Sequence, residues 1–276
     1  MPMNSSVNNK CDIPESLYHY TNVDVLALIL KHRTLRRNSL TNMDDRQEQA
    51  SKDNQNFGRF VFVSSWTDSE REEIPMWKMY TPPHCGVRIR MKVNPFKLYP
   101  GFENTMGVLP LLEPLNQEYF LSNNRVDKIL TRVTYTDDND LLVPQVIFND
   151  TDNQRVHVNL DKVGIYKNTY WKFQREWRYR LCFYPFSLGK AINQSFSKTQ
   201  QGMPKEINTL IQNMIDGTSS MPFTYYDLQL ADDAFDNMEI TLSPDISESS
   251  KIFVHLLLEK YAPNCRARES KLKDLL

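Results

Sequence analysis

Glycine is scarce in this chain, which has 8 glycines among its 276 residues. The sequence contains neither G-x-x-x-x-G-K-S/T nor G-x-G-x-x-G, the two glycine-rich patterns that hold phosphates at the start of a helix. The scarcity of glycine therefore nearly excludes a P-loop and the Rossmann dinucleotide fingerprint.

Cysteine and histidine are also too sparse for the common metal and redox sites. The four cysteines, Cys11, Cys85, Cys182 and Cys265, lie far apart, so the chain has no C-x-x-C pair, and this spacing favours reduced thiols. No two of the five histidines have metal-ligand spacing, and H-E-x-x-H, EF-hand and G-x-S-x-G patterns are missing. The sequence therefore predicts no metal site.

Long apolar runs and an excess of charge are missing as well. No apolar run approaches the length of a membrane span, and the first ten residues lack the apolar core of a signal peptide. The formal net charge of -1 gives no global field toward nucleic acid or a membrane, although it leaves room for a local basic patch. We therefore expect a soluble, cytoplasmic protein without a membrane partner.

The chain does contain enough apolar material for a large core, with 40% hydrophobic and 11% aromatic residues. The hydrophobic patterns predict one α+β domain over residues 1–276, with a flexible start at 1–15 and insertions at 94–126 and 185–235. Strands are predicted at 17–21, 34–40, 59–66, 86–93, 176–183, 238–242 and 265–268, and helices after Asn22 and at 74–80, 161–173, 205–215 and 247–261. The last helix carries residues that we expect to be largely buried: Ile252, Phe253, His255, Leu256, Leu257 and Leu258.

The densest aromatic and charged run of the sequence is 170–180, and from Glu176 onward it has the period of a strand. One face of this strand is apolar, with Trp177, Tyr179, Leu181 and Phe183. The opposite face carries Glu176, Arg178 and Arg180. This charged face is either an outer surface paired with water, or a catalytic carboxylate kept ionised by nearby arginines.

A second strand, beginning at Gly86, alternates apolar residues with Arg88, Arg90 and Lys92. These three cations share one face of the predicted strand. They form either a solvated outer face or a stripe that contacts the phosphates of a nucleic acid.

The remaining polar candidates are weak when each is taken alone. His19 and Thr21 share one face of a short strand, where a histidine is commonly structural. Trp77 and Tyr80, three residues apart on a short helix, are either core residues or a platform for a ligand. The acidic turn with Asp44, Asp45 and Glu48 is most simply explained as a helix cap.

In their order along the chain, these pieces resemble the DUF2971 family. The resemblance spans residues 17–272 and depends on the succession of motifs, since no single motif is specific. The motifs are Leu17-Tyr18-His19-Tyr20-Thr21 before an apolar helix, Asp44-Asp45-Arg46-Gln47-Glu48, Ser64-Ser65-Trp66 at a strand end, Met76-Trp77-x-x-Tyr80, Gly86 before an alternating strand, Trp171-x-Phe173-x-x-Glu176-Trp177-Arg178, Ile240 to Asp245 before a helix, and Ser270-Lys271-Leu272.

Families of this kind are similar to the ADP-ribosyltransferase superfamily, which includes toxins that modify nucleic acid. The resemblance implies a split, strongly bent mixed β-sheet around a cleft, with peripheral helices. It implies NAD as a substrate, with its ribose held by His19 and Thr21 and its nicotinamide stacked near Tyr80 or Trp77. Glu176 would act on the reacting ribose or on the acceptor.

The chemistry of this reaction suits the residues that the resemblance selects. Breaking the nicotinamide–ribose bond builds positive charge on the ribose, which a fixed carboxylate stabilises. Arginines near the site, such as Arg178, can bind the pyrophosphate. The chain departs from the family pattern at two positions, because Asp44 stands where asparagine is usual and Gln174 where glutamate is usual. The second departure leaves Glu176 as the one candidate carboxylate on its strand and points to an altered acceptor or to lost activity.

Two hypotheses of different classes follow. The first is an NAD-dependent ADP-ribosyltransferase whose acceptor is nucleic acid, contacted through Arg88, Arg90 and Lys92. A role in toxicity or phage defence, with an antitoxin or regulatory protein as partner, is implied by the resemblance alone. The second is a non-catalytic binding module of the same fold that senses a nucleotide or a partner. The feature that discriminates them is whether His19 and Glu176 converge on one cavity.

Overall fold

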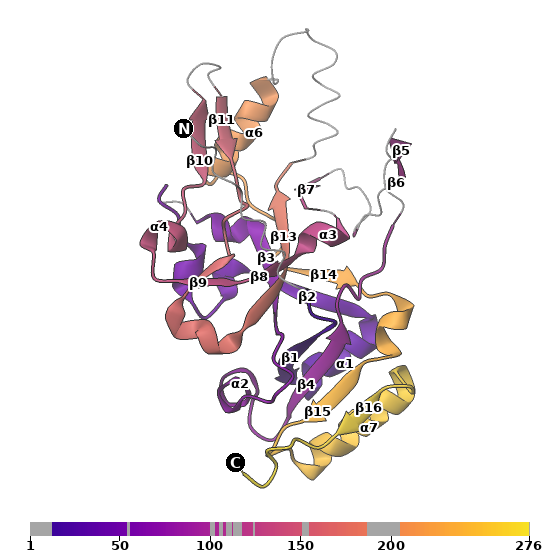
Figure 1. Ribbon diagram of the computed structural model, residues 1–276. Helices are drawn as coiled ribbons and strands as arrows, with labels where there is room; N and C mark the ends of the chain where they lie inside the picture. The colour runs from indigo at the N-terminus through magenta and orange to yellow at the C-terminus, as the bar shows by residue number, and fades with distance from the viewer. Residues whose placement is uncertain are drawn as a thin grey trace.

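The computed structural model describes residues 13–53, 56–99, 103–104, 107–108, 112, 118–123, 125–150, 155–186 and 205–275. Most of the predicted flexible start and parts of both predicted insertions lie outside these residues. Within them the protein has an α+β fold built on a large, open, mixed sheet of ten strands, with helices around it (Figure 1). The main hydrophobic cluster runs from Leu17 to Cys265 and draws on most of these elements.

The sheet follows the order β14-β2-β3-β1-β4-β15-β16, and β13 pairs with β3 as well as with two short strands, β7 and β8. The bounds are β1 (Ser16–Asn22), β2 (Thr34–Ser39), β3 (Val61–Thr67), β4 (Gly86–Lys92), β7 (Phe120–Leu121), β8 (Leu130–Arg132), β13 (Glu176–Tyr184), β14 (Tyr225–Gln229), β15 (Glu239–Leu242) and β16 (Arg266–Arg268). All of these pairs are antiparallel except β15 with β16. Three small two-stranded sheets lie apart from it: β5 (Glu103–Asn104) with β6 (Gly107–Val108), β9 (Thr134–Thr136) with β12 (Tyr166–Asn168), and β10 (Ile147–Asp150) with β11 (Arg155–Val158).

Four of the five predicted helices are confirmed. These are α1 (Val23–His32), α2 (Ile74–Tyr80), α6 (Lys205–Ile215) and α7 (Glu248–Tyr261). Short helical turns complete the described part: α3 (Val126–Ile129), α4 (Asn139–Leu142), η1 (Leu40–Asn42), η2 (Arg46–Gln49), η3 (Phe57–Phe60), η4 (Thr169–Gln174) and η5 (Asp232–Phe235). No helix in the described ranges is long and apolar enough to cross a membrane.

Local chemistry explains where α1 begins and ends. The side chain of Asn22 accepts a hydrogen bond of 2.8 Å from the backbone N–H of Val25, which satisfies one of the free donors of the first turn. At the other end Arg33 takes a left-handed conformation with φ of 54°, and its N–H bonds to the Ile29 carbonyl. The helix therefore connects β1 to β2 through a fixed, short path.

The sheet opens between β1 and β2. On one edge of β3, β1 pairs only through Tyr18 and Thr67, and β2 pairs only near the other end, through Asn38 with Val63 and Ser39 with Phe62. The opposite edge of β3 pairs continuously with β13, from Thr67 to Val61. The backbone at 64–65 therefore faces a gap between two diverging strands, and this gap positions the candidate site.

One predicted helix, 161–173, is wrong. The chain instead makes a turn, then β12, which runs parallel to β9, and then the 3-10 helix η4. Gly164 has φ of +75°, and a Cβ at this position would lie 2.6 Å from Leu40 Cδ1. Tertiary contacts decide the conformation here, because carbonyls of this turn accept hydrogen bonds from arginines of β13.

The prediction that six residues of α7 are largely buried holds for Leu258 and is wrong for Ile252, Phe253, His255 and Leu256, while Leu257 is half-buried. Val254 and Leu258 are buried, whereas Ile252, Phe253 and Leu256 are more than half exposed. The helix contacts α1 and β16 with one side only, and Figure 1 shows it at the periphery of the molecule.

Candidate functional site

Beside the gap between β1 and β2, where β1, β3 and β13 meet, the structure contains a cavity of about 110 Å³. Its wall brings together residues that are far apart in the sequence, including His19 from β1, Tyr80 from α2 and Glu176 from β13. The convergence of His19 and Glu176 on one cavity, the feature that discriminates the two hypotheses, is therefore present.

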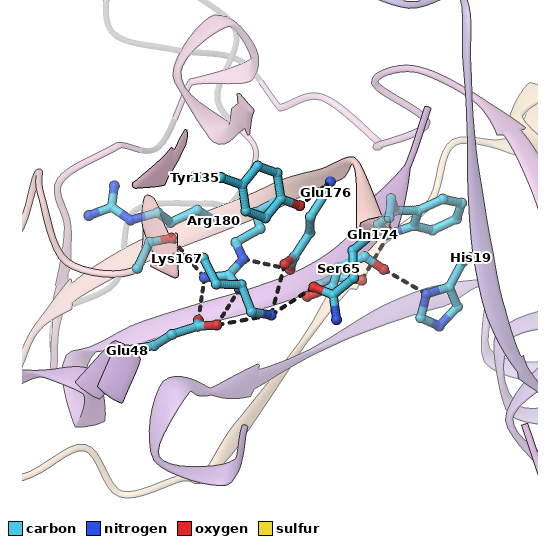
Figure 2. A network of polar contacts seen from close by, with 12 residues as sticks. His19, Glu48, Ser65, Tyr135, Lys167, Gln174, Glu176 and Arg180 are labelled. Atoms are coloured by element: carbon cyan, nitrogen blue, oxygen red, sulfur yellow. Dashed lines mark hydrogen bonds and ion pairs between the residues drawn. The ribbon is translucent and has the colours of Figure 1, made fainter. Parts of the chain in front are cut away.

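Two carboxylates and two cations form a buried quartet at this cavity (Figure 2). Glu176 Oε1 lies 2.7 Å from Arg178 Nε, and Glu176 Oε2 lies 3.1 Å from Lys167 Nζ. The same two cations also bind Glu48, with Lys167 Nζ at 3.1 Å and Arg178 Nη2 at 2.9 Å from Glu48 Oε1. Side-chain exposure is between 1% and 8% for all four residues. The formal charges cancel, so the quartet satisfies the rule that buried charges are paired.

The quartet keeps Glu176 ionised. Burial acts to raise the pKa of this carboxyl, but the charges of Arg178 and Lys167 and the hydrogen bond from Arg178 outweigh it, so the pKa lies well below its ordinary value. The backbone N–H of Glu176 donates a hydrogen bond of 2.8 Å to the hydroxyl of Tyr135. The carboxylate is therefore a fixed negative charge rather than a proton donor at neutral pH.

The interpretation of the charged face of β13 as a solvated surface is wrong. Glu176, Arg178 and Arg180 have exposed fractions of 4%, 1% and 6%. The turn before β12 covers this face with backbone carbonyls. Arg178 Nη1 donates to Gly164 O at 2.9 Å, and Arg180 Nε donates to Val163 O at 2.9 Å. A charged face thus becomes interior because another part of the chain supplies its acceptors.

The predicted role of Arg178, binding the pyrophosphate of NAD, competes with its contacts inside the protein. The pyrophosphate of NAD requires a guanidinium with free donors. Arg178 instead uses Nε, Nη1 and Nη2 for Glu176, Gly164 and Glu48. Its position identifies it as the residue that holds the two carboxylates in place.

His19 presents a neutral imidazole to the cavity. Its Nδ1 lies 2.8 Å from the carbonyl oxygen of Ser65, which can only accept, so Nδ1 carries the proton and Nε2 is an acceptor. Burial lowers the pKa of this imidazole, and the bond to Ser65 only partly opposes that effect. The ring stacks on Trp66 with centroids 5.0 Å apart, which fixes its plane.

Tyr80 and Gln174 form the wall between His19 and the quartet. Gln174 donates a hydrogen bond through Nε2 to the Tyr80 hydroxyl and accepts one of 2.9 Å from Lys167 Nζ through Oε1. Burial and the nearby carboxylates of Glu176 and Asp44 raise the pKa of Tyr80, so the phenol stays protonated. An amide at position 174 can donate to Tyr80 while accepting from Lys167, which a glutamate there could not do when ionised.

A larger open groove, of about 550 Å³, runs along the gap between β1 and β2, adjoins the cavity and shares His19, Asp44 and Tyr80 with it. Thr21 lines this groove rather than the cavity, and its side chain is largely buried. The two spaces together offer room for a ligand longer than one sugar.

Trp77 does not reach the cavity. It is 3% exposed, packs edge to face against Tyr20, and donates its indole N–H to Glu72 Oε2 at 3.1 Å. Glu72 also accepts from Ser270 Oγ and from the Lys271 N–H, so this carboxylate anchors the end of the chain to α2. The structure thus makes Trp77 a core residue, and of the two predicted stacking aromatics it brings only Tyr80 to the site.

The three cations of β4 do not form one surface stripe. Arg88 is fully buried, donates to the carbonyl of Glu70 at 2.7 Å and lies 4.0 Å from the centroid of the Tyr18 ring. A polyanion at the surface is out of its reach. Arg90 is half-buried and Lys92 is exposed, so these two remain the predicted phosphate contacts.

Sequence analysis missed two members of the quartet. Glu48 was assigned to the cap of the acidic turn, a role that Asp45 fills by accepting from the Gln47 N–H at 3.0 Å. Lys167 lies in the segment wrongly predicted as a helix. No local signal identifies Lys167. One of its partners, Glu176, lies on β13, and the other, Glu48, lies in η2, more than a hundred residues earlier.

No family model, curated protein or solved structure matches this chain. The family resemblance therefore stays a prediction, and an argument about function depends on the geometry of the cavity. That geometry combines a fixed carboxylate, a neutral imidazole acceptor, a protonated phenol and an amide. Such a set can bind a hydroxylated ligand and stabilise positive charge that develops on it.

Proposed function

We propose that this protein is an ADP-ribosyltransferase-like protein that binds NAD in the cavity beside β1 and β13 and in the groove that adjoins it, and that it cleaves the nicotinamide–ribose bond. The observation that carries the proposal is the convergence of His19 and Glu176, 157 positions apart, on one cavity at the opening of the sheet. The opening itself, where β1 and β2 each meet β3 at one end only, supports a split-sheet fold of this superfamily.

The proposed step breaks the bond between nicotinamide and the ribose, and neutral nicotinamide leaves with the electron pair while positive charge develops on the ribose ring. A nucleophilic oxygen or nitrogen of the acceptor then bonds to the same ribose carbon and gives up its proton. In this proposal the ionised Glu176 stabilises that charge, and His19 accepts a hydrogen bond from a ribose hydroxyl. The ring of Tyr80 stacks near the nicotinamide, and Thr21 contacts the part of NAD that extends into the groove. Arg178 and Lys167 contribute indirectly, because they fix the orientation of the carboxylate.

Replacing His19 by alanine is expected to weaken NAD binding about three- to tenfold, the value of one lost hydrogen bond. Unfolding free energy should fall by about 1–3 kcal/mol, since the lost internal contacts are one bond to a carbonyl and the ring contact with Trp66. Calorimetric titration with NAD measures the first effect, and urea unfolding measures the second. His157→Ala, on β11 and outside both the cavity and the groove, is the matched control and should leave NAD affinity unchanged. Unchanged NAD affinity in His19→Ala would remove this residue from the site.

The acceptor that we propose is nucleic acid, with Arg90 and Lys92 as phosphate contacts. Changing both to glutamine should weaken binding to single-stranded RNA or DNA and reduce the slope of log affinity against log salt by about 1 to 2. The control is the double change of Arg125 and Lys128, which removes the same charge from another exposed site. If the control lowers the slope as much as the test variant does, β4 makes no specific contact.

A specific observation favours a second candidate function, that of a non-catalytic sensor of nucleotides. Glu176 is 4% exposed and both of its oxygens already bind cations, while the second family carboxylate is replaced by Gln174. A protein that only binds NAD would release no nicotinamide at any enzyme concentration. Binding and turnover measured on the same preparation therefore separate the two functions.

A further inference from the structure

Helix α7 has two faces of similar apolarity but opposite environment. Val254 and Leu258 are buried in the core, on the side that contacts α1 and β16. The other side exposes Ile252 at 52%, Phe253 at 59% and Leu256 at 55%. Three large apolar side chains grouped on one exposed side of a helix are the composition of an interface.

The charges on the exposed face follow a pattern. Glu248, Ile252, Leu256 and Lys260 are spaced by four residues, so they form one ridge along the helix. Both charged residues are exposed, one at each end, with the two aliphatic side chains between them. Along the helix the ridge carries one acidic residue, two apolar residues and one basic residue, in that order.

When this ridge is placed against a second copy of itself that runs in the opposite direction, each charged end meets an end of opposite charge. In an antiparallel pair of α7 helices related by a twofold axis at position 254, Ile252 lies opposite Leu256 of the second copy. Phe253 lies on the same flank as Phe253 of the second copy, and Glu248 lies opposite Lys260 along the ridge. Each contact between two different residues occurs twice, as an isologous interface requires.

We propose that the exposed face of α7 is the interface of a homodimer, in which two copies of this chain pack their α7 helices antiparallel. The charge pattern favours a second copy over an unrelated partner, because the ridge itself supplies both members of each ion pair in the register that also buries its apolar residues. This inference is independent of the proposed function, since none of these residues lines the cavity or the groove.

The test is sedimentation of the full chain over concentrations from low micromolar to several hundred micromolar. We expect a reversible monomer–dimer equilibrium. Leu256→Asp should remove the dimer, and Lys260→Glu should weaken it about tenfold or more, because it sets two pairs of like charges against each other. The double change Glu248→Lys with Lys260→Glu restores opposite charges and should return the affinity to within about threefold of the unaltered protein.

Two controls make the result unambiguous. Leu98→Asp alters a leucine with an exposed fraction of 45% that lies outside α7, and it should leave the dimer unchanged. Circular dichroism should show that each variant is folded, as expected for substitutions of exposed side chains. A protein that is monomeric at all concentrations would overturn the proposal, as would a dimer insensitive to Leu256→Asp or a double charge swap that fails to restore it.

Discussion

Replacing Glu176 by glutamine is expected to lower the rate of nicotinamide release from NAD by about two to four orders of magnitude, the usual effect of losing a positioned charge in a transition state. Glutamine keeps the size and one acceptor of the side chain, so the cavity should retain its shape. NAD binding should change little, because the lost charge matters mainly when the ribose becomes positive. Release of nicotinamide is measured by chromatography under saturating NAD.

Glu48→Gln is the matched control for this experiment. It removes the same charge from the same quartet, so it should cost similar stability, roughly 1–3 kcal/mol for a weakened charged hydrogen bond. If Glu176 carries the chemical step, Glu48→Gln should retain far more turnover than Glu176→Gln. Equal loss in both variants would mean that turnover only reports the integrity of the quartet, and full turnover in Glu176→Gln would reject the assignment.

The second large effect concerns stability. Replacing Arg178 by methionine is expected to lower the free energy of unfolding by about 3–5 kcal/mol, the usual cost of leaving a buried charge without its partner. The substitution leaves Glu48 and Glu176 buried together with Lys167 as their one shared cation. It also leaves the carbonyl of Gly164 without the donor that binds it. Urea unfolding followed by fluorescence measures the change.

Arg175→Met is the matched control, because it alters an arginine three residues earlier in the same stretch. The Arg175 side chain is 55% exposed and pairs with Asp68. An exposed ion pair contributes little, so this variant should lose less than about 1 kcal/mol. If the two variants were equally stable, the quartet would not be the stabilising feature that its burial and distances indicate.

The elements that were predictable from the sequence are those whose causes are local. The cap of α1 at Asn22, its basic last turn, and the alternation along β4 and β13 are all encoded within a few residues. These signals do not depend on what packs against the element. They located the strands that carry His19 and Glu176, and therefore the cavity.

The features that could not be predicted depend on distant parts of the chain. A charged strand face is solvated by default, and β13 departs from this only because the carbonyls of Val163 and Gly164 cover it. The same hydrogen bonds stabilise a turn in the segment 161–173, where the sequence pattern predicts a helix. Arg88 shows the same effect, since the rings of Tyr18 and Tyr20 on β1 enclose its guanidinium. In each case the competing partner lies on a different segment of the chain.

Some residues of the site could be predicted from the sequence, and others could not. Glu176, His19 and Tyr80 were selected by motif order, and all three line the cavity. Glu48 and Lys167 were not selected as site residues, because pairing between four charges from three segments leaves no spacing signal in a single sequence. Trp77 was selected for its aromatic ring, but its helix turns that ring toward Tyr20 and Glu72.

The central claim is that NAD binds in the cavity between His19 and Glu176, and the most direct measurement is a crystal structure of the Glu176→Gln protein with NAD. We expect the nicotinamide ribose within hydrogen-bonding distance of His19 and of residue 176, and the nicotinamide near the ring of Tyr80. NAD found elsewhere on the protein, or no heat of binding at millimolar NAD in the same variant and in the unaltered protein, would contradict it.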